Sequence, residues 1–203
     1  MNIKKIPIVA LVLSNLVPLV GIFMMKYSVF DIIAVYVAET GVIAFYTIIK
    51  IFFAKKESSP HTQILGKPAN MVSKVTVVFV FIISFSFFLL LQTFFVLSLF
   101  KENSIEISRI WLSVFALFVS HGISLIQNYF IAGDREHSAP DEFFIPVFIR
   151  IFISQAVVIG GAQLFLVMLA VFGPTVAAQI LLVSIKIIAD IARYMKEHKT
   201  QFV

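Results

Sequence analysis

An uncharged apolar run in the middle of the chain constrains the fold more than any other feature. After Lys74 the sequence has no charged residue until Lys101, and the stretch to Phe100 is rich in Phe, Leu and Val. A helix needs about 20 mostly apolar residues to cross the hydrocarbon core of a bilayer. Residues 74–100 are therefore predicted to form a membrane-spanning helix.

Further apolar runs of similar length fill most of the chain. Of its 203 residues 60% are hydrophobic, and the mean hydropathy is +1.02, which is typical of membrane proteins. We therefore expect an all-α polytopic membrane protein, a single transmembrane domain over residues 1–203 built as a six-helix bundle. The predicted helices are residues 6–25, 30–53, 74–100, 109–131, 145–172 and 175–195.

Six spans place both termini on the same side of the membrane. Most of the lysines and arginines lie near the termini and in the loops at 54–73 and 132–144, whereas Lys26, Lys101 and Arg109 lie on the other side. The positive-inside rule then predicts cytoplasmic termini. We expect a multi-pass protein of the cytoplasmic membrane of a bacterium or archaeon, with the lipid bilayer as its main partner.

Several classes of function find no support in the sequence. The net charge of +5 suits a membrane topology and anionic lipid, and no basic run with interleaved aromatics indicates a nucleic-acid partner. The absence of cysteine excludes disulfides and cysteine nucleophiles. No nucleotide-binding or hydrolase motif occurs, and His61, His137 and His198 lack metal-ligand spacing. We therefore expect no cofactor and no metal.

Ionisable and amide side chains within the apolar runs are the candidate site. A charge at the centre of a spanning helix costs about 2.5–3.5 kcal/mol on insertion scales. Two of the candidates fall near the middle of the membrane, and the others fall in its cytoplasmic half. We expect them to meet in one polar cluster that opens to the cytoplasm. The candidates are Glu39, His121, Asn128, Arg150, Lys186 and Asp190.

Helical spacing suggests how these side chains pair. His121 and Asn128 share a helix face, and Lys186 can form a local ion pair with Asp190. Arg150 requires a carboxylate, for which Asp190 and Glu39 are the candidates. Structural alternatives stay open for each residue: Glu39 can be protonated and bonded to a backbone carbonyl, and His121 can be a hydrogen-bonded core histidine.

These residues favour the binding or movement of a small ion or solute. In this interpretation Glu39 and His121 exchange protons or coordinate a cation, and the basic groups select or gate it from the cytoplasmic side. One alternative is a membrane enzyme for lipid or lipid-linked substrates, with His121 as base and Arg150 on a phosphate. Another is an assembly subunit without chemistry, which would contact other helices or a second copy through Ala156 and Gly160.

Several segments together resemble a known family. They are SNLVPLVGIF, YVAETGVIAFYTIIK, SHGIS, PVFIRIF and LVSIKIIADI, which run through nearly the whole chain. The sequence is similar to a family of prokaryotic multi-span membrane proteins catalogued only as a domain of unknown function. It departs from that pattern at Val37, where a Trp is expected, and at Gln155, where a His is expected. The resemblance implies a membrane bundle and no particular activity.

Overall fold

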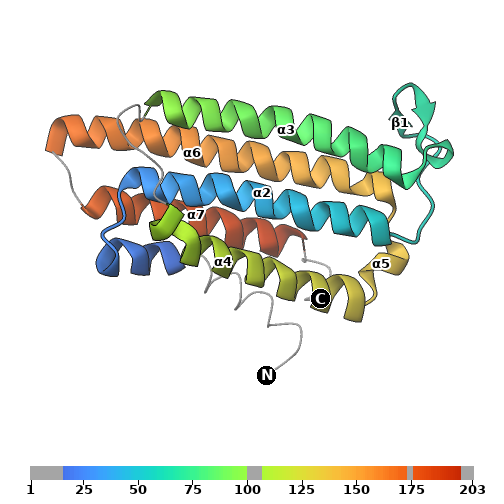
Figure 1. The fold of residues 1–203 in the computed structure, drawn as a ribbon, viewed down its shortest axis with the longest axis horizontal. Coiled ribbons are helices and arrows are strands. Elements are labelled where there is room, and N and C mark those ends of the chain that lie inside the picture. Colours follow the sequence, from blue (N-terminus) through green and yellow to red (C-terminus); the bar gives the residue numbers. More distant parts are fainter. Residues whose placement is uncertain (1–15, 100–106, 173–175, 198–203) are drawn as a thin grey trace.

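The chain folds into a set of long helices that lie side by side (Figure 1). The computed structural model describes residues 16–99, 107–172 and 176–197, and beyond residue 149 it describes a part of the side chains. The first described helix covers residues 16–24. The other elements are α2 (Val29–Phe53), β1 (Gln63–Ile64), β2 (Lys67–Pro68), the 3-10 turn η2 (Ala69–Met71), α3 (Lys74–Leu99), α4 (Ile107–Ser124), the π-helix η3 (Leu125–Ile131), α5 (Asp134–His137), the 3-10 turn η4 (Pro140–Phe143), α6 (Phe144–Phe172) and α7 (Val176–Glu197).

Helices occupy the positions that the apolar runs predict. Three of them are long and apolar enough to cross a membrane by length and composition, namely Val29–Phe53, Lys74–Ser98 and Ser108–Ile131. α6 and α7 follow the fifth and sixth predicted spans closely, while residues 6–15 of the first lie outside the described residues. The chain is thus a largely helical protein with candidate membrane spans.

Helix α2 begins at a defined cap. The Ser28 side chain accepts a hydrogen bond from the Asp31 backbone N–H (3.1 Å), and the Ser28 backbone N–H donates to the Asp31 carboxylate (2.8 Å). This reciprocal capping box satisfies two backbone groups that the first turn of a helix leaves unpaired. The cap fixes the start of α2 after a link of few residues, so that the helix reverses sharply from the one before it.

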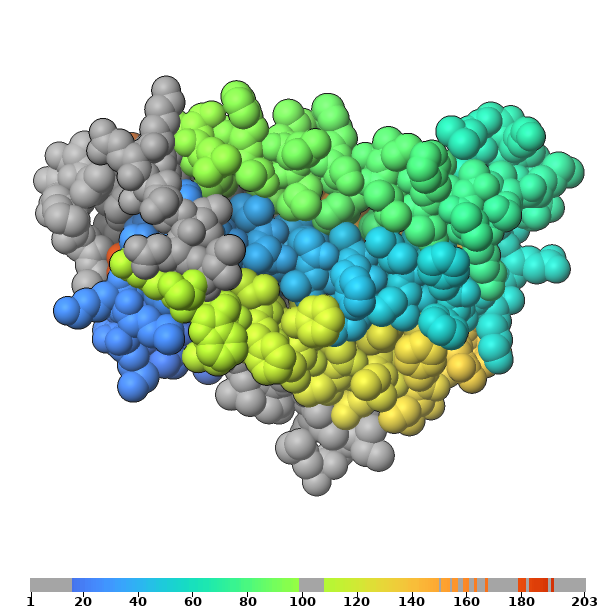
Figure 2. Space-filling model, viewed as in Figure 1, coloured from blue at the N-terminus to red at the C-terminus, as the bar shows by residue number. Residues whose placement is uncertain are grey.

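Helix α2 is the centre of the fold. It packs against α3, α4, α6 and α7, and 61% of its most apolar window is buried, compared with 28% for α3 and for the span that contains α4. Figure 2 shows that on one face α2 comes to the surface as a band between α3 and α4. The inward-facing side of α2 therefore lies among several helices.

Two apolar clusters divide α2 along its length. The first surrounds its N-terminal half and includes Tyr36, with Leu117 from α4 and Val183 from α7. The second surrounds its C-terminal half and includes Phe81 from α3 and Ile151 from α6. The stretch of α2 between the two clusters buries Glu39 and Thr40.

A tyrosine in the link before α2 ties one end of the bundle together. The Tyr27 hydroxyl donates to the carbonyl of Arg109 at 2.6 Å and lies 3.1 Å from the hydroxyl of Ser113, both on α4. The Gln179 side chain of α7 donates to the Tyr27 carbonyl at 3.0 Å. A Cβ at Gly21 would overlap the buried Tyr27 ring, so the glycine lets the preceding helix pack directly on it.

Candidate functional site: a buried charge cluster

Glu39 is buried on α2 between the two apolar clusters. It lies about 15 Å along the helix axis from the first residue of α2, close to the middle of a span. Its side chain is 2% exposed. The neighbouring Thr40 hydroxyl donates back to the Tyr36 carbonyl (3.1 Å), as threonines in helices commonly do. A carboxylate at this depth requires a polar partner, because burial without one is costly.

Lys186 of α7 supplies that partner. Its Nζ lies 2.9 Å from Oε2 of Glu39, and its side chain is 4% exposed. The same nitrogen lies 5.5 Å from the centroid of the Tyr36 ring, within the range of a cation–π contact. Tyr36 precedes Glu39 by three residues and so shares its face of α2. The ammonium group is thus held by a carboxylate and an aromatic face of the same helix.

His121 of α4 approaches the other oxygen of Glu39. Its Nε2 lies 3.9 Å from Oε1, which is longer than a hydrogen bond but within ion-pair distance when the imidazole is protonated. The His121 side chain is 13% exposed, which makes it the most open of the three ionisable groups. Lys186 of α7 and His121 of α4 therefore lie next to different oxygens of the Glu39 carboxylate.

The SHGIS motif shapes the contact between α2 and α4. A Cβ at Gly122 would lie 2.8 Å from the Tyr46 hydroxyl, so a larger residue would push that hydroxyl away. The hydroxyl donates to the Phe118 carbonyl at 2.8 Å, and the Tyr46 ring lies beside His121 with centroids 6.3 Å apart. Gly122 thus allows Tyr46 of α2 to approach α4 closely, and the Tyr46 ring covers one side of the His121 imidazole.

The other candidate residues do not all join this cluster. Asn128 lies on η3, where its Nδ2 donates to the Ser124 hydroxyl at 3.3 Å, and the described contacts place no hydrogen bond between it and Glu39. Arg150 and Asp190 lie on α6 and α7, but their side chains fall outside the described residues. In the described part, the cluster therefore joins Glu39, His121 and Lys186 from three helices.

A family comparison places the chain among known sequences. A family model described as "Family of unknown function (DUF6498)" matches residues 2–201. The chain belongs to the DUF6498 family. This match confirms the predicted resemblance to a family of unknown function over nearly the whole sequence. No curated protein and no solved structure matches the chain, so the comparisons assign no activity to this DUF6498 protein.

Polar residues of α3 and η3 add features that the sequence analysis did not interpret. Gln92 of α3 is buried, and neither of its amide atoms has a hydrogen-bond partner in the described part of the protein. The buried Oε1 of Gln127 likewise has no hydrogen-bond partner in the described part of the protein. It lies in the π-helix, where the Ala132 N–H donates to the Gln127 carbonyl at 2.8 Å. Such π-helical turns are often found at functional sites.

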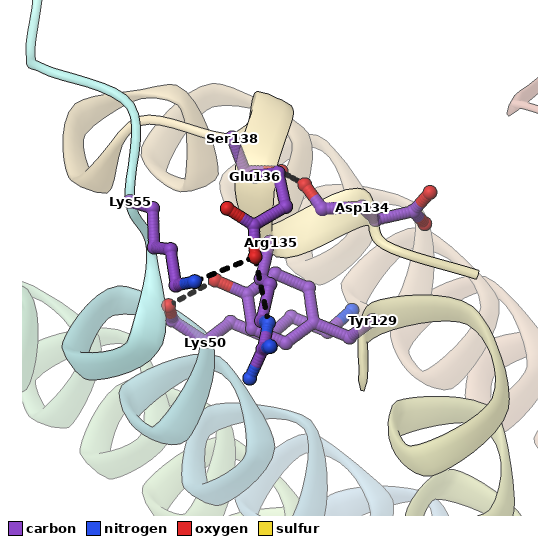
Figure 3. A network of polar contacts seen from close by, with 7 residues as sticks. All are labelled: Lys50, Lys55, Tyr129, Asp134, Arg135, Glu136 and Ser138. Carbon is purple, nitrogen blue, oxygen red and sulfur yellow. Dashed lines mark hydrogen bonds and ion pairs between the residues drawn. The ribbon is translucent and has the colours of Figure 1, made fainter. Parts of the chain in front are cut away.

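A second polar network joins two loops at the end of the bundle where α2 finishes (Figure 3). Lys55 Nζ lies 2.7 Å from the Glu136 carboxylate, and Arg135 Nε donates to the same oxygen at 3.1 Å. The Lys55 backbone N–H donates to the Arg135 carbonyl at 2.9 Å. Tyr129 donates its hydroxyl proton to the Lys50 carbonyl at 2.6 Å. The ion pairs of this network are solvent-exposed, and the network is separate from the buried cluster.

The network continues through a second pair, in which Lys56 contacts the Glu142 carboxylate. The hydrogen bond from Lys55, together with the Lys55 and Arg135 charges, lowers the pKa of Glu136 despite an opposing effect of burial. Burial raises the pKa of Glu142, but the Lys56 and Ala139 hydrogen bonds and the Lys56 charge outweigh it, so that this pKa is also lowered. Neither network resembles a metal site, and the described residues contain no group of three His, Asp or Glu that could hold one.

The loop network is expected to loosen in acid. Because both carboxylates titrate below their ordinary value of 4.5, the stability they contribute is present above that pH and is lost as the pH falls through the lowered values. Hydrogen exchange at the backbone N–H groups of Lys55 and Lys56, corrected for intrinsic rate, should show protection at about pH 6 that falls towards about pH 3.5. The Ala54 N–H, bonded to the Lys50 carbonyl at 2.9 Å, is the control that should keep its protection.

Proposed function

We propose that this DUF6498 protein binds protons at the Glu39–His121–Lys186 cluster and moves them across a cytoplasmic membrane. The observation that supports this is the meeting of a carboxylate, an imidazole and an ammonium group from three helices within 3.9 Å at the middle of an apolar bundle. Ionisable groups at such depth are rare and usually mark ion or proton pathways.

The composition of the cluster argues for function beyond packing. A buried ion pair is costly to desolvate, and apolar residues of similar volume often stabilise a protein equally well or better. Two charges would suffice to lock α2 to α7. The third group, His121, adds a side chain whose ordinary pKa lies in the physiological range and which is therefore suited to proton exchange.

The geometry indicates an order of events. His121 is the most exposed member, so it takes up the proton first and passes it to the nearer Glu39 oxygen, 3.9 Å away, after a small approach or through one water. A protonated Glu39 no longer neutralises Lys186. Proton binding and the Glu39–Lys186 ion pair are therefore alternative states of one carboxylate. Switching between these two states changes the contact between α7 and α2. In this way the protonation of Glu39 is coupled to a movement of α7 relative to α2.

The orientation in the membrane forms part of the proposal. The hairpin β1–β2 and the loop around α5 lie at the same end of the bundle in Figure 1, and both carry basic residues, including Lys67 and Arg135. We propose that this end faces the cytoplasm. The chain has no cysteine, so single cysteines can report the topology. In whole cells, a membrane-impermeant maleimide should label Lys26→Cys and leave Glu57→Cys, in the exposed stretch before the hairpin, unlabelled; the reverse pattern would refute the orientation.

Proton movement can be tested in proteoliposomes that contain a pH-sensitive dye. A potassium diffusion potential set up with valinomycin should drive acidification faster in vesicles with the protein than in protein-free vesicles. Glu136→Gln, which removes a carboxylate from the solvent-facing loop network, should leave the rate unchanged. Rates equal to those of protein-free vesicles, at either polarity of the potential, would refute the proposal.

A further inference from the structure

The hairpin that links α2 to α3 has an unusual residue at its turn. Its strands pair Gln63 with Pro68 and Ile64 with Lys67, which leaves Leu65 and Gly66 as a two-residue loop. Both have positive φ, 53° and 75°. This is the backbone of a type I′ turn, which favours Asn-Gly and disfavours a side chain such as leucine. A leucine at a strained position raises the question of what its side chain contributes in return.

Leu65 does not contact the core of the bundle. It is 73% exposed, and Met71 in the adjacent 3-10 turn is 76% exposed. Together with Ile64 and Val72 they line a hollow of about 190 Å³ between the hairpin and the first turn of α3. Figure 2 shows the hairpin projecting beyond the end of α3. The tip of a polar loop thus presents large apolar side chains to the surroundings.

This apolar tip continues the outer surface of α3. Val75 and Phe79, one helical turn apart, are both exposed and lie on one face of a helix that is apolar enough to span a membrane. Lys67, on the second strand of the hairpin, is exposed and forms no ion pair within the described part of the chain. Apolar side chains beside an unpaired lysine at the end of a span are the composition that suits the headgroup region of an anionic bilayer.

We propose that the β1–β2 hairpin is an interfacial anchor, which inserts Leu65 and Met71 into the headgroup region of the bilayer while Lys67 contacts anionic lipid. The patch adjoins the exposed apolar face of α3, a helix long and apolar enough to cross a membrane, and it includes an exposed lysine. A lipid surface is therefore the occupant that fits. The anchor fixes the depth of α3 and does not depend on proton movement by the buried cluster.

The anchor can be tested by measuring the depth of a probe next to it. Asn70→Cys in the cysteine-free chain places an environment-sensitive fluorophore beside Met71 without removing either apolar side chain, and Glu57→Cys is the matched loop control. The vesicles contain phosphatidylethanolamine with about 30% phosphatidylglycerol. The label at residue 70 should be quenched by lipids spin-labelled near the top of the acyl chain and protected from aqueous iodide. The label at residue 57 should show the opposite behaviour.

Leu65→Asn separates anchoring from folding of the hairpin. Asn-Gly is the favoured type I′ sequence, so the hairpin should be retained and the melting temperature unchanged or higher. Lipid quenching at residue 70 should fall by at least half and iodide quenching should rise. Lys67→Glu should reduce lipid quenching in the anionic vesicles and have little effect in pure phosphatidylcholine.

Three results would overturn the anchor. The first is iodide quenching at residue 70 as strong as at residue 57. The second is a lower melting temperature of Leu65→Asn, which would show that the leucine packs on the protein. The third is protection that grows with the protein-to-lipid ratio, which would mean that a second copy covers the tip.

Discussion

Replacing Lys186 with methionine is expected to lower the free energy of unfolding by about 3–5 kcal/mol, because it leaves the Glu39 carboxylate buried without its partner. Methionine keeps most of the volume and the apolar stem of lysine, so a cavity contributes little. The measurement is the midpoint of denaturant-induced unfolding in mixed micelles, with helical circular dichroism as the signal. The control is Lys56→Met, which removes a solvent-exposed lysine of the loop network and should change stability by less than about 1 kcal/mol.

The double variant Glu39→Gln with Lys186→Met tests whether the stability lost in Lys186→Met comes from the unpaired Glu39 carboxylate. Removing both charges leaves no uncompensated ion, so most of the lost stability should return. This non-additivity is the signature of a direct contact such as the 2.9 Å pair. If the two single changes simply added, or if Lys186→Met cost less than about 1 kcal/mol, Glu39 and Lys186 would not form a buried ion pair in the protein.

Removing the proton-exchanging groups is expected to stop proton movement. Glu39→Gln removes the carboxylate that lies between His121 of α4 and Lys186 of α7, and it should reduce the dye-detected rate to that of protein-free vesicles. His121→Phe keeps an aromatic ring next to Tyr46 and should reduce the rate on the order of 10-fold or more, since proton transfer by a positioned side chain is lost. Its stability should stay within about 1.5 kcal/mol of the parent, because an aromatic ring is kept and the partly exposed position leaves room for a larger one.

These variants also separate the proposed function from a purely structural role. If His121 only fills space, His121→Phe would keep both stability and rate. If His121 is a structural hydrogen-bond donor, stability and rate would fall together. A fall in rate with stability retained is the outcome that requires proton exchange at His121.

The positions of the long helices follow from the sequence mainly because each apolar run has the length of a helix. The runs 30–53 and 74–100 differ by a single residue from α2 and α3 as the structure has them. A hydropathy pattern does not distinguish an α-helix from a π-helix. The change from α4 to η3 after Ser124 therefore could not be predicted. The sequence predicted only a polar linker over residues 54–73. The β1–β2 hairpin within it was missed because Leu65-Gly66 is not a typical hairpin turn sequence.

The candidate site was only partly predictable. The depths of Glu39 and His121 in their spans indicated a meeting at the middle of the bundle, and the structure places them 3.9 Å apart. Helical spacing offered Lys186 a neighbour on its own helix, Asp190, whose side chain lies outside the described residues, whereas the structure brings Lys186 to Glu39 on α2. Residue spacing along one helix says nothing about how two helices are rotated relative to each other. The length of the lysine side chain also lets Lys186 reach partners on a neighbouring helix.

The central claim is that the buried cluster acts on protons and is not merely a fastening between helices. The most direct test is the proton movement of the double variant Glu39→Gln with Lys186→Met in proteoliposomes, measured on protein that has recovered its stability. We predict a folded, stable protein with the rate of protein-free vesicles. A double variant that moved protons as fast as the parent would contradict the account, because the pathway would then not pass through Glu39.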